Sequence, residues 1–356
     1  MDAKRDFSEP LAYAALAVLL LLVLPQTLDD FRLNLMGKYL AFAFVAVGIV
    51  LTWGYGGILS LGQGIFFGAG GYMMAMFLKL EASAPELPDF MVWSSVETLP
   101  TWWVPFRSLG ATVALILMVP TLFAWGFSYL VFRKRVGGVY FAIVTLALAL
   151  TMTVLIIGQQ GDTGGANGIT DFRTMLGWDI LSDEAKRTIY FAQVGLLLAA
   201  MLTASWIVRS RLGKLLIAIR DREDRVRFSG YDTAMIKAAV FAFAALLSAV
   251  GGAMYTLQAG LIAPGVVGVV SSVEMVIYAA VGGRLSVVGA VVGALLVGFL
   301  KSWLSESFPE AWLFFLGTLF ILVVAVLPNG LAGIAGRFAH VWRPKEVPSA
   351  TAAGRP

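Results

Sequence analysis

Long apolar blocks divide the chain, and they limit most strongly what it can fold into. A helix needs about 20 mostly apolar residues to cross the roughly 30 Å hydrocarbon core of a membrane. Several blocks of that length, such as 108–132, 138–157 and 238–257, contain no charged residue. A charge at a helix centre would cost about 2.5–3.5 kcal/mol on insertion. The blocks predict ten membrane spans, at 11–25, 35–53, 57–79, 108–132, 138–157, 188–208, 238–257, 269–283, 285–304 and 311–328.

The expected fold is therefore an all-α polytopic membrane protein with about ten transmembrane helices, some of them short or broken at glycines. Only 13% of the residues are charged, about half the share of a soluble domain, and solid apolar blocks do not fit a membrane β-barrel. The chain has no cysteine, and its single histidine, His340, lies in a polar tail. We expect no catalytic residues, metal site or cofactor.

The first apolar segment has two interpretations. Leu11 to Leu24 is short and follows Lys4 and Arg5, as in a cleaved secretory signal. However, no small-x-small cleavage site follows Leu24. This favours a retained first span.

Basic residues predict the orientation. Most of the 26 lysines and arginines fall on one side when alternate connections are counted, and the richer side is cytoplasmic by the positive-inside rule. We expect a cytoplasmic N-terminus (1–10), a transmembrane domain (11–328) and a cytoplasmic tail (329–356). Within the domain we expect outer loops at 80–107 and 158–187 and a long cytoplasmic loop at 209–237.

A glycine-rich stretch, 53–64, is not explained by spanning alone, because glycine costs about 1 kcal/mol relative to alanine inside a helix. One interpretation is close packing of helices through small residues. The other is a broken helix lining a solute path, with Ser60 and Gln63 offering hydrogen bonds beside Gly64.

A second unusual stretch, 271–286, contains Glu274, the only acidic residue inside a predicted span. An intramembrane carboxylate is a functional candidate. Alternatively, Glu274 follows Ser271 and Ser272 as a helix cap. Gly282 and Gly283 also belong to the candidate path. The pattern Gly-Gly-x-Leu-Ser occurs both here (282–286) and at 56–60, which hints at an internal repeat.

The long cytoplasmic loop predicts an amphipathic helix. An apolar stripe recurs at helical spacing, formed by Leu212, Leu215, Leu216 and Ile219. Asp221 with Arg225, and Glu223 with Arg227, are acid–base pairs four residues apart, and Gly230 is placed to end the helix. Such a helix either lies on anionic lipid or docks a cytoplasmic partner.

The chain is not expected to bind ATP itself. The glycine-rich outer loop 158–172 has no Lys-Ser or Lys-Thr, and Gly213-Lys214 lacks both the upstream glycine and the hydroxyl of a P-loop.

From about Asn34 to Ala335, the sequence resembles the permease subunits of ATP-binding-cassette importers of the branched-chain amino-acid and urea type. The stretches that carry the resemblance are 53–64, 138–143, 218–221, 281–283 and 327–333. Within that family it is most similar to the second, larger permease of the urea importer, through 87–93, 163–172, 225–231 and 309–314. Gln63 departs from the frequent His, and Leu285-Ser286 from the usual Gly-Thr, which bears on substrate rather than fold.

The resemblance implies a subunit that is not an enzyme, in the bacterial inner membrane. It would form a heterodimer with a related permease, with two cytoplasmic ATPase subunits and an extracytoplasmic binding protein, and would bind no nucleic acid. It would move urea, or a similar small polar solute, inward by alternating access. On this reading the ATPase-coupling residues are Leu216, Ile219, Arg220, Asp221, Asp224, Arg225 and Gly230.

Two other functions stay open. One is a branched-chain amino-acid permease of the same importer class. The other is a self-sufficient channel or secondary carrier for a small neutral solute, although an ion-driven carrier ordinarily has several buried ionisable groups. The scarcity of buried charge fits a neutral solute such as urea.

Overall fold

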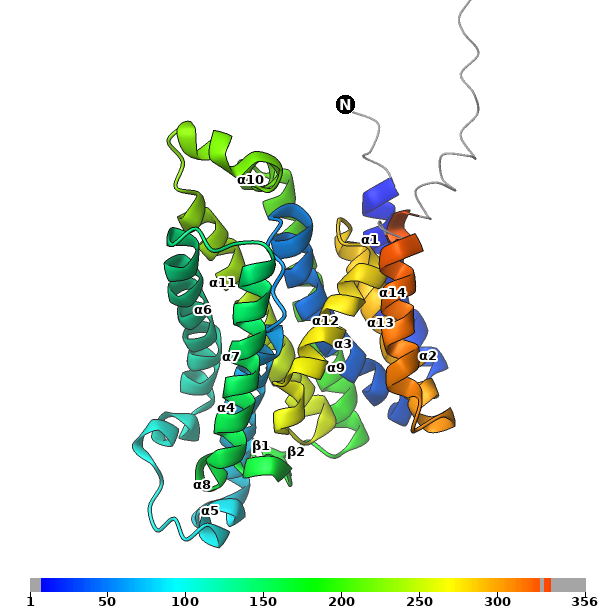
Figure 1. Cartoon of the computed structure of the whole chain (residues 1–356). Coiled ribbons are helices and arrows are strands. Elements are labelled where there is room, and N and C mark those ends of the chain that lie inside the picture. The colour runs from blue at the N-terminus through cyan, green and yellow to red at the C-terminus, as the bar shows by residue number, and fades with distance from the viewer. Residues whose placement is uncertain (1–7, 327–329, 334–356) are drawn as a thin grey trace, which may run out of the picture.

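The computed structural model describes residues 8–326 and 330–333. These residues form a bundle of long helices with one two-stranded hairpin (Figure 1). The helices are α1 (Ser8–Val18), α2 (Leu24–Thr27), α3 (Asp30–Ile49), α4 (Gln63–Ser83), α5 (Asp89–Trp93), α6 (Leu109–Arg133), α7 (Val139–Gly158), α8 (Gln160–Thr163), α9 (Asp183–Arg209), α10 (Arg211–Phe228), α11 (Thr233–Ala259), α12 (Val269–Gly282), α13 (Val287–Ser307) and α14 (Trp312–Val326). Shorter elements are the π-helical turns η1 (Leu19–Val23) and η2 (Val50–Tyr55), the 3-10 turns η3 (Thr101–Arg107), η4 (Gly165–Asn167) and η5 (Pro264–Val266), and strands β1 (Thr174–Met175) and β2 (Trp178–Asp179).

The predicted polytopic all-α fold is confirmed. Within the described residues, eight helical segments are long and apolar enough to cross a membrane. The shorter apolar helices α12 and α14 correspond to the other two predicted spans. The last two residues of the final predicted span, 327 and 328, lie outside the described residues, as do 1–7 and, apart from 330–333, the tail.

The span predicted at 57–79 is wrong at its start. Residues 57–62 are not helical, and α4 begins only at Gln63. Before this break, α3 continues into η2, so one helical rod runs from Asp30 to Tyr55. Gly57 has a positive φ of 67°, a conformation that glycine adopts without steric cost and that takes the chain out of the helix.

Helix α11 packs against α3, α4 and α6 at the centre of the bundle. Close backbone approach makes this packing possible, because a Cβ at Gly252 of α11 would lie 1.7 Å from the Phe67 carbonyl oxygen of α4. Aromatic side chains fill the same region, where Phe42 stacks on Phe67 with ring centroids 4.9 Å apart.

The bundle has two different ends. Helix α10 lies at one end, together with the start of α1 and the end of α14, whereas α5, α8 and the β1–β2 hairpin lie at the other (Figure 1). The hairpin turn has positive φ angles at Leu176 and Gly177, as type I′ turns require. Both turn amides donate to the Glu81 carboxylate of α4, at 2.9 and 2.8 Å.

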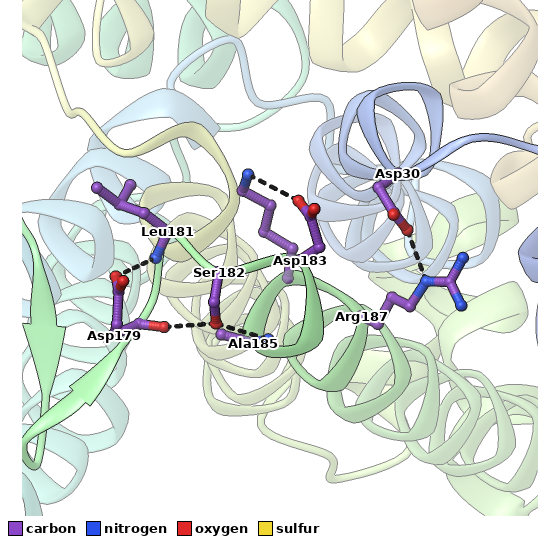
Figure 2. A network of polar contacts seen from close by, with 8 residues as sticks. Asp30, Asp179, Leu181, Ser182, Asp183, Ala185 and Arg187 are labelled. Carbon is purple, nitrogen blue, oxygen red and sulfur yellow. Dashed lines mark hydrogen bonds and ion pairs between the residues drawn. The ribbon is translucent and has the colours of Figure 1, made fainter.

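At the hairpin end, polar contacts hold the start of α9 (Figure 2). Ser182 caps the helix by accepting from the Ala185 amide at 3.3 Å and donating to the Asp179 carbonyl at 2.8 Å. Arg187 joins α9 to α3 through Asp30, at 2.6 Å. The start of α9 is thereby held both to the loop that precedes it and to the start of α3.

Candidate functional site

The N-terminal turns of α4 and α12 meet inside the bundle. The Gly64 amide of α4 donates to the Ser272 hydroxyl of α12 at 3.2 Å. A Cβ at Gly64 would lie 2.5 Å from that hydroxyl and 2.7 Å from the Val267 carbonyl oxygen, so only glycine fits. The start of α4 and the first turn of α12 therefore lie side by side at the buried residues Gln63 and Ser272, where the helix dipoles present partial positive charge.

Gln63 is the first residue of α4 and is fully buried. Its side-chain Oε1 accepts from the Ser248 hydroxyl of α11 at 3.1 Å. Its Nε2 has no hydrogen-bond partner among the described residues. A buried amide left this way costs about 1–3 kcal/mol, which marks the position as one that a hydrogen-bond acceptor would stabilise.

The chain reaches this point through the non-helical segment 58–62. Ser60 is buried there, and its hydroxyl accepts from the Gly62 amide at 3.3 Å. The Leu61 amide donates to the Thr145 hydroxyl of α7 at 3.1 Å. Each of the two interpretations of the glycine-rich stretch describes part of it. The helix is broken at 57–62, and the glycines at 62 and 64 allow close packing.

Glu274 lies elsewhere on α12 and is paired. Lys301 of α13 donates to its carboxylate at 2.7 Å and lies over the Trp312 ring. The expected role as a helix cap is wrong, because α12 begins at Val269 with Gly268 as its cap residue. Sequence reasoning missed this pair; the available signal was that Lys301 also falls inside a predicted span.

Gly282 is the last residue of α12, and Gly283 begins the turn to α13. A Cβ at Gly282 would lie 2.0 Å from the Gly289 carbonyl oxygen, so glycine at this position allows α12 and α13 to pack closely. Gly283 has φ 119°, which takes the chain out of the helix. In the same turn, the Leu285 carbonyl accepts from the Tyr55 hydroxyl at 3.0 Å. The residue just before the first Gly-Gly-x-Leu-Ser stretch therefore contacts the second stretch.

The predicted amphipathic helix is α10, but its apolar stripe faces the bundle. Leu216 is fully buried in the main core cluster, Ile219 is also buried, and Leu212 packs against that cluster. The stripe is thus covered by the chain itself rather than displayed to a partner. A periodic stripe predicts a buried face but not what covers it.

One of the two predicted acid–base pairs forms. Glu223 accepts from Arg227 at 3.0 Å, whereas Asp221 pairs with its neighbour Arg220 at 3.0 Å rather than with Arg225. The reason is a kink, since Arg222 has the non-helical angles φ −152° and ψ 76°. This breaks the helical register between positions 221 and 225.

Glu223 also clamps α10 to α11, by accepting from Thr233 at 3.0 Å and Lys237 at 2.5 Å. Partial burial raises the pKa of Glu223, but Lys237, Thr233 and Arg227 together outweigh burial and leave the pKa below its usual value. A lowered carboxyl pKa adds stability above the unfolded value that is lost as pH falls through the folded value. The clamp is therefore closed at neutral pH.

The exposed surface of α10 is charged, with one large aromatic residue. Asp224 and Arg225 are exposed, and Phe228 at the end of the helix is 93% exposed. Gly230 has φ 88° and follows the last helical turn, as predicted. The periodicity did not single out Phe228, although an apolar residue outside the buried stripe was the available signal.

Comparisons with known proteins agree on one family. The family model described as the permease component of branched-chain amino-acid transport systems matches residues 31–324. The high-affinity branched-chain amino-acid transport permease LivM of Escherichia coli strain K12 is 26% identical over 313 residues, which cover 82% of this chain and 67% of LivM.

Two other relatives extend the comparison. BraD, a branched-chain amino-acid permease of Pseudomonas aeruginosa, is 23% identical over 302 residues, covering 82% of this chain and 91% of BraD. The ribose import permease RbsC of Haemophilus influenzae is 22% identical over 343 residues, which cover 92% of this chain and 95% of RbsC. No solved structure matches the chain significantly. Since the family match spans well over half of a chain built from membrane-spanning helices, this protein belongs to the family of permease components of branched-chain amino-acid transport systems.

Proposed function

We propose that this chain is the membrane-spanning subunit of an importer driven by ATP hydrolysis in partner subunits. It pairs with a second, related permease, two cytoplasmic ATPase subunits and an extracytoplasmic binding protein. The family match supports this assembly, and α10 is the observation that carries it. This helix stands at one end of the bundle (Figure 1). Its outer surface is charged and carries the exposed Phe228.

The orientation follows from the same helix. The α10 end holds the basic-rich loop, the start of α1 and the end of α14. Because positive charge is retained on the cytoplasmic side, we place this end in the cytoplasm of a bacterial inner membrane. The hairpin end then faces the binding protein.

The solute path runs past the point where α4 and α12 begin. Ser60, Gln63 and Gly64 line it, whereas Glu274, Gly282 and Gly283 shape the α12–α13 region beside it. Broken helices whose N-termini meet at depth are a recurring design of solute sites in transporters. The unpartnered Gln63 Nε2 provides a donor there.

Urea is the proposed solute. Gln63, Ser248 and Ser272 meet at the α4–α12 junction as uncharged hydrogen-bonding groups, while Glu274 is neutralised by Lys301. A neutral molecule with a carbonyl acceptor and amino donors needs such groups and no counter-charge.

A branched-chain amino acid is the second candidate. It is favoured by the names of LivM and BraD and by the two helix N-termini, which suit a carboxylate. RbsC is a ribose permease, so resemblance alone does not fix the solute.

Uptake by the assembled importer in vesicles, with each binding protein tried in turn, tests both candidates. ATP-dependent uptake of labelled urea that excess leucine leaves unchanged supports urea. Leucine uptake that urea leaves unchanged supports the amino acid. Uphill uptake by this chain alone, without ATPase subunits, would refute the importer proposal in favour of a self-sufficient carrier.

Replacing Gln63 with methionine is expected to weaken the apparent affinity for solute about fivefold, since one neutral hydrogen bond contributes about 1 kcal/mol. The side chains are similar in volume, so packing is preserved. The KM for uptake by the reconstituted importer measures the effect. Gln193→Met is the matched control, because Gln193 is equally buried but bonds to the Gly37 carbonyl. An unchanged KM in Gln63→Met removes Gln63 from the path.

Replacing Phe228 with serine is expected to weaken binding of the ATPase subunits at least tenfold, because exposed aromatic residues that become buried often dominate an interface. Co-purification of the ATPase with the permease over a range of ATPase concentrations measures it. Phe31→Ser is the control, since Phe31 is 77% exposed at the opposite end of the bundle. Equal losses for both variants would exclude a docking role for Phe228.

A further inference from the structure

Helix α10 consists of two halves, each attached to a different part of the bundle. The kink at Arg222 separates them. Beyond the kink, Glu223 holds the second half to Lys237 of α11. Before it, the guanidinium Nη1 of Arg220 donates to the carbonyl oxygen of Gly54 in η2 at 2.7 Å. This second bond is charge-assisted, a class about twice as strong as a neutral hydrogen bond.

The backbone to which Arg220 donates has close neighbours on two sides. A Cβ at Gly57 would lie 2.8 Å from the Arg220 Cγ, and a Cβ at Gly54 would lie 1.8 Å from the Arg284 carbonyl oxygen in the α12–α13 turn. The Arg284 guanidinium also lies over the Trp53 ring, 5.8 Å from its centroid. Gly54 thus lies directly against the α12–α13 turn, and Gly57 lies directly against Arg220 of α10.

From this point a short non-helical segment, residues 58–62, leads to Gln63 at the candidate site. Hydrogen bonds hold this segment at both ends, because the Ile58 amide donates to the Thr52 carbonyl at 2.8 Å and the Leu61 amide donates to the Thr145 hydroxyl at 3.1 Å. A five-residue segment that is held in this way takes up little displacement, so a movement of residues 54–57 is passed to the start of α4. Helix α12 connects the same two places. The turn after α12 contacts Tyr55, and the first helical turn of α12 holds Gly64 through Ser272.

We propose that Arg220 is the positioning residue that transmits movement of α10 through Gly54 and the segment 58–62 to Gln63, so that ATPase action opens and closes the α4–α12 junction. This inference rests on the proposed importer function. It assigns the first half of α10 to transmission, whereas Glu223 keeps the second half fixed to α11.

The test uses the complete importer with its ATPase subunits. The chain has no cysteine of its own, so a single Leu61→Cys variant reports on the segment 58–62. Its rate of labelling by N-ethylmaleimide is compared without nucleotide and with ATP and vanadate. We expect at least a threefold difference between the two states, and we expect Arg220→Ala in the same chain to abolish that difference.

Arg220→Ala is also expected to retain ATP hydrolysis within twofold while uptake falls at least tenfold. Arg220→Lys, which keeps a charged donor, is expected to recover part of the uptake. Lys214→Ala is the matched control, because it removes an exposed charge from the first half of α10; it is expected to leave both readouts unchanged.

Several outcomes would overturn the inference. The first is a labelling rate of Leu61→Cys that is the same with and without nucleotide when Arg220 is present. The second is a nucleotide-dependent labelling rate that persists in Arg220→Ala. The third is loss of the ATPase subunits from Arg220→Ala, which would make Arg220 a docking residue. All three are compatible with ATP-driven uptake by the unaltered importer. If that uptake itself is absent, the proposed function fails instead.

Discussion

Gly252→Ala is expected to destabilise the protein by more than about 3 kcal/mol, the upper range for overpacking a core. The added methyl carbon would lie 1.7 Å from the Phe67 carbonyl oxygen. Backbone atoms cannot rotate away as a side chain can, so α4 and α11 would have to separate. Gly70 shows the same closeness from the other helix, because a Cβ there would lie 2.0 Å from the Ala249 carbonyl oxygen.

Thermal unfolding of the detergent-solubilised protein, followed by the monodisperse fraction on size exclusion, measures this effect. Gly195→Ala in α9 is the control, because a Cβ there meets no atom within 4 Å. Alanine is the better helix former, so this variant should match the parent or exceed it slightly. If Gly252→Ala and Gly195→Ala unfold at the same temperature, close backbone packing between α4 and α11 is not what holds the bundle.

The spans were predictable because the hydrocarbon thickness fixes the length of an apolar helix. All ten predicted segments overlap helices in the described residues, and the largest mismatch is the first six positions of 57–79. Hydropathy does not distinguish a non-helical apolar segment from a helical one, so the break at 57–62 was visible only in its glycines. Its position became clear from Gly57, which has a positive φ.

The surroundings of the candidate residues were less predictable. Periodicity identified α10 as a helix, but its apolar stripe is covered by the chain's own bundle. The kink at Arg222, which lets Asp221 pair with Arg220, could not be predicted because no proline or glycine lies near it in the sequence. Arg220 itself was predicted as a coupling residue, whereas its bond to Gly54 joins positions 166 residues apart. Such contacts depend on tertiary packing and leave no local pattern.

Removing the ammonium group of Lys301 is expected to destabilise the protein by about 3 kcal/mol, the cost of an unpaired charge within a membrane span. The Glu274 side chain is 4% exposed, and Lys301 is its ion-pair partner at 2.7 Å. Lys301→Met would leave the carboxylate without its cation and with a long hydrogen bond from the Tyr278 hydroxyl, at 3.5 Å.

Glu274→Gln in the Lys301→Met chain is expected to restore most of that stability, because a neutral amide removes the buried charge rather than its partner. Replacing both members of a buried pair is often neutral, whereas replacing one is not. Thermal unfolding of the two single variants and the double variant yields the coupling energy, and additive losses would contradict pairing. Uptake by the double variant then separates structure from transport. If stability returns but uptake does not, Glu274 contacts the solute. If both return, the carboxylate serves to hold α12 against α13. In that case Gln63 and the two helix N-termini are the groups that bind the solute.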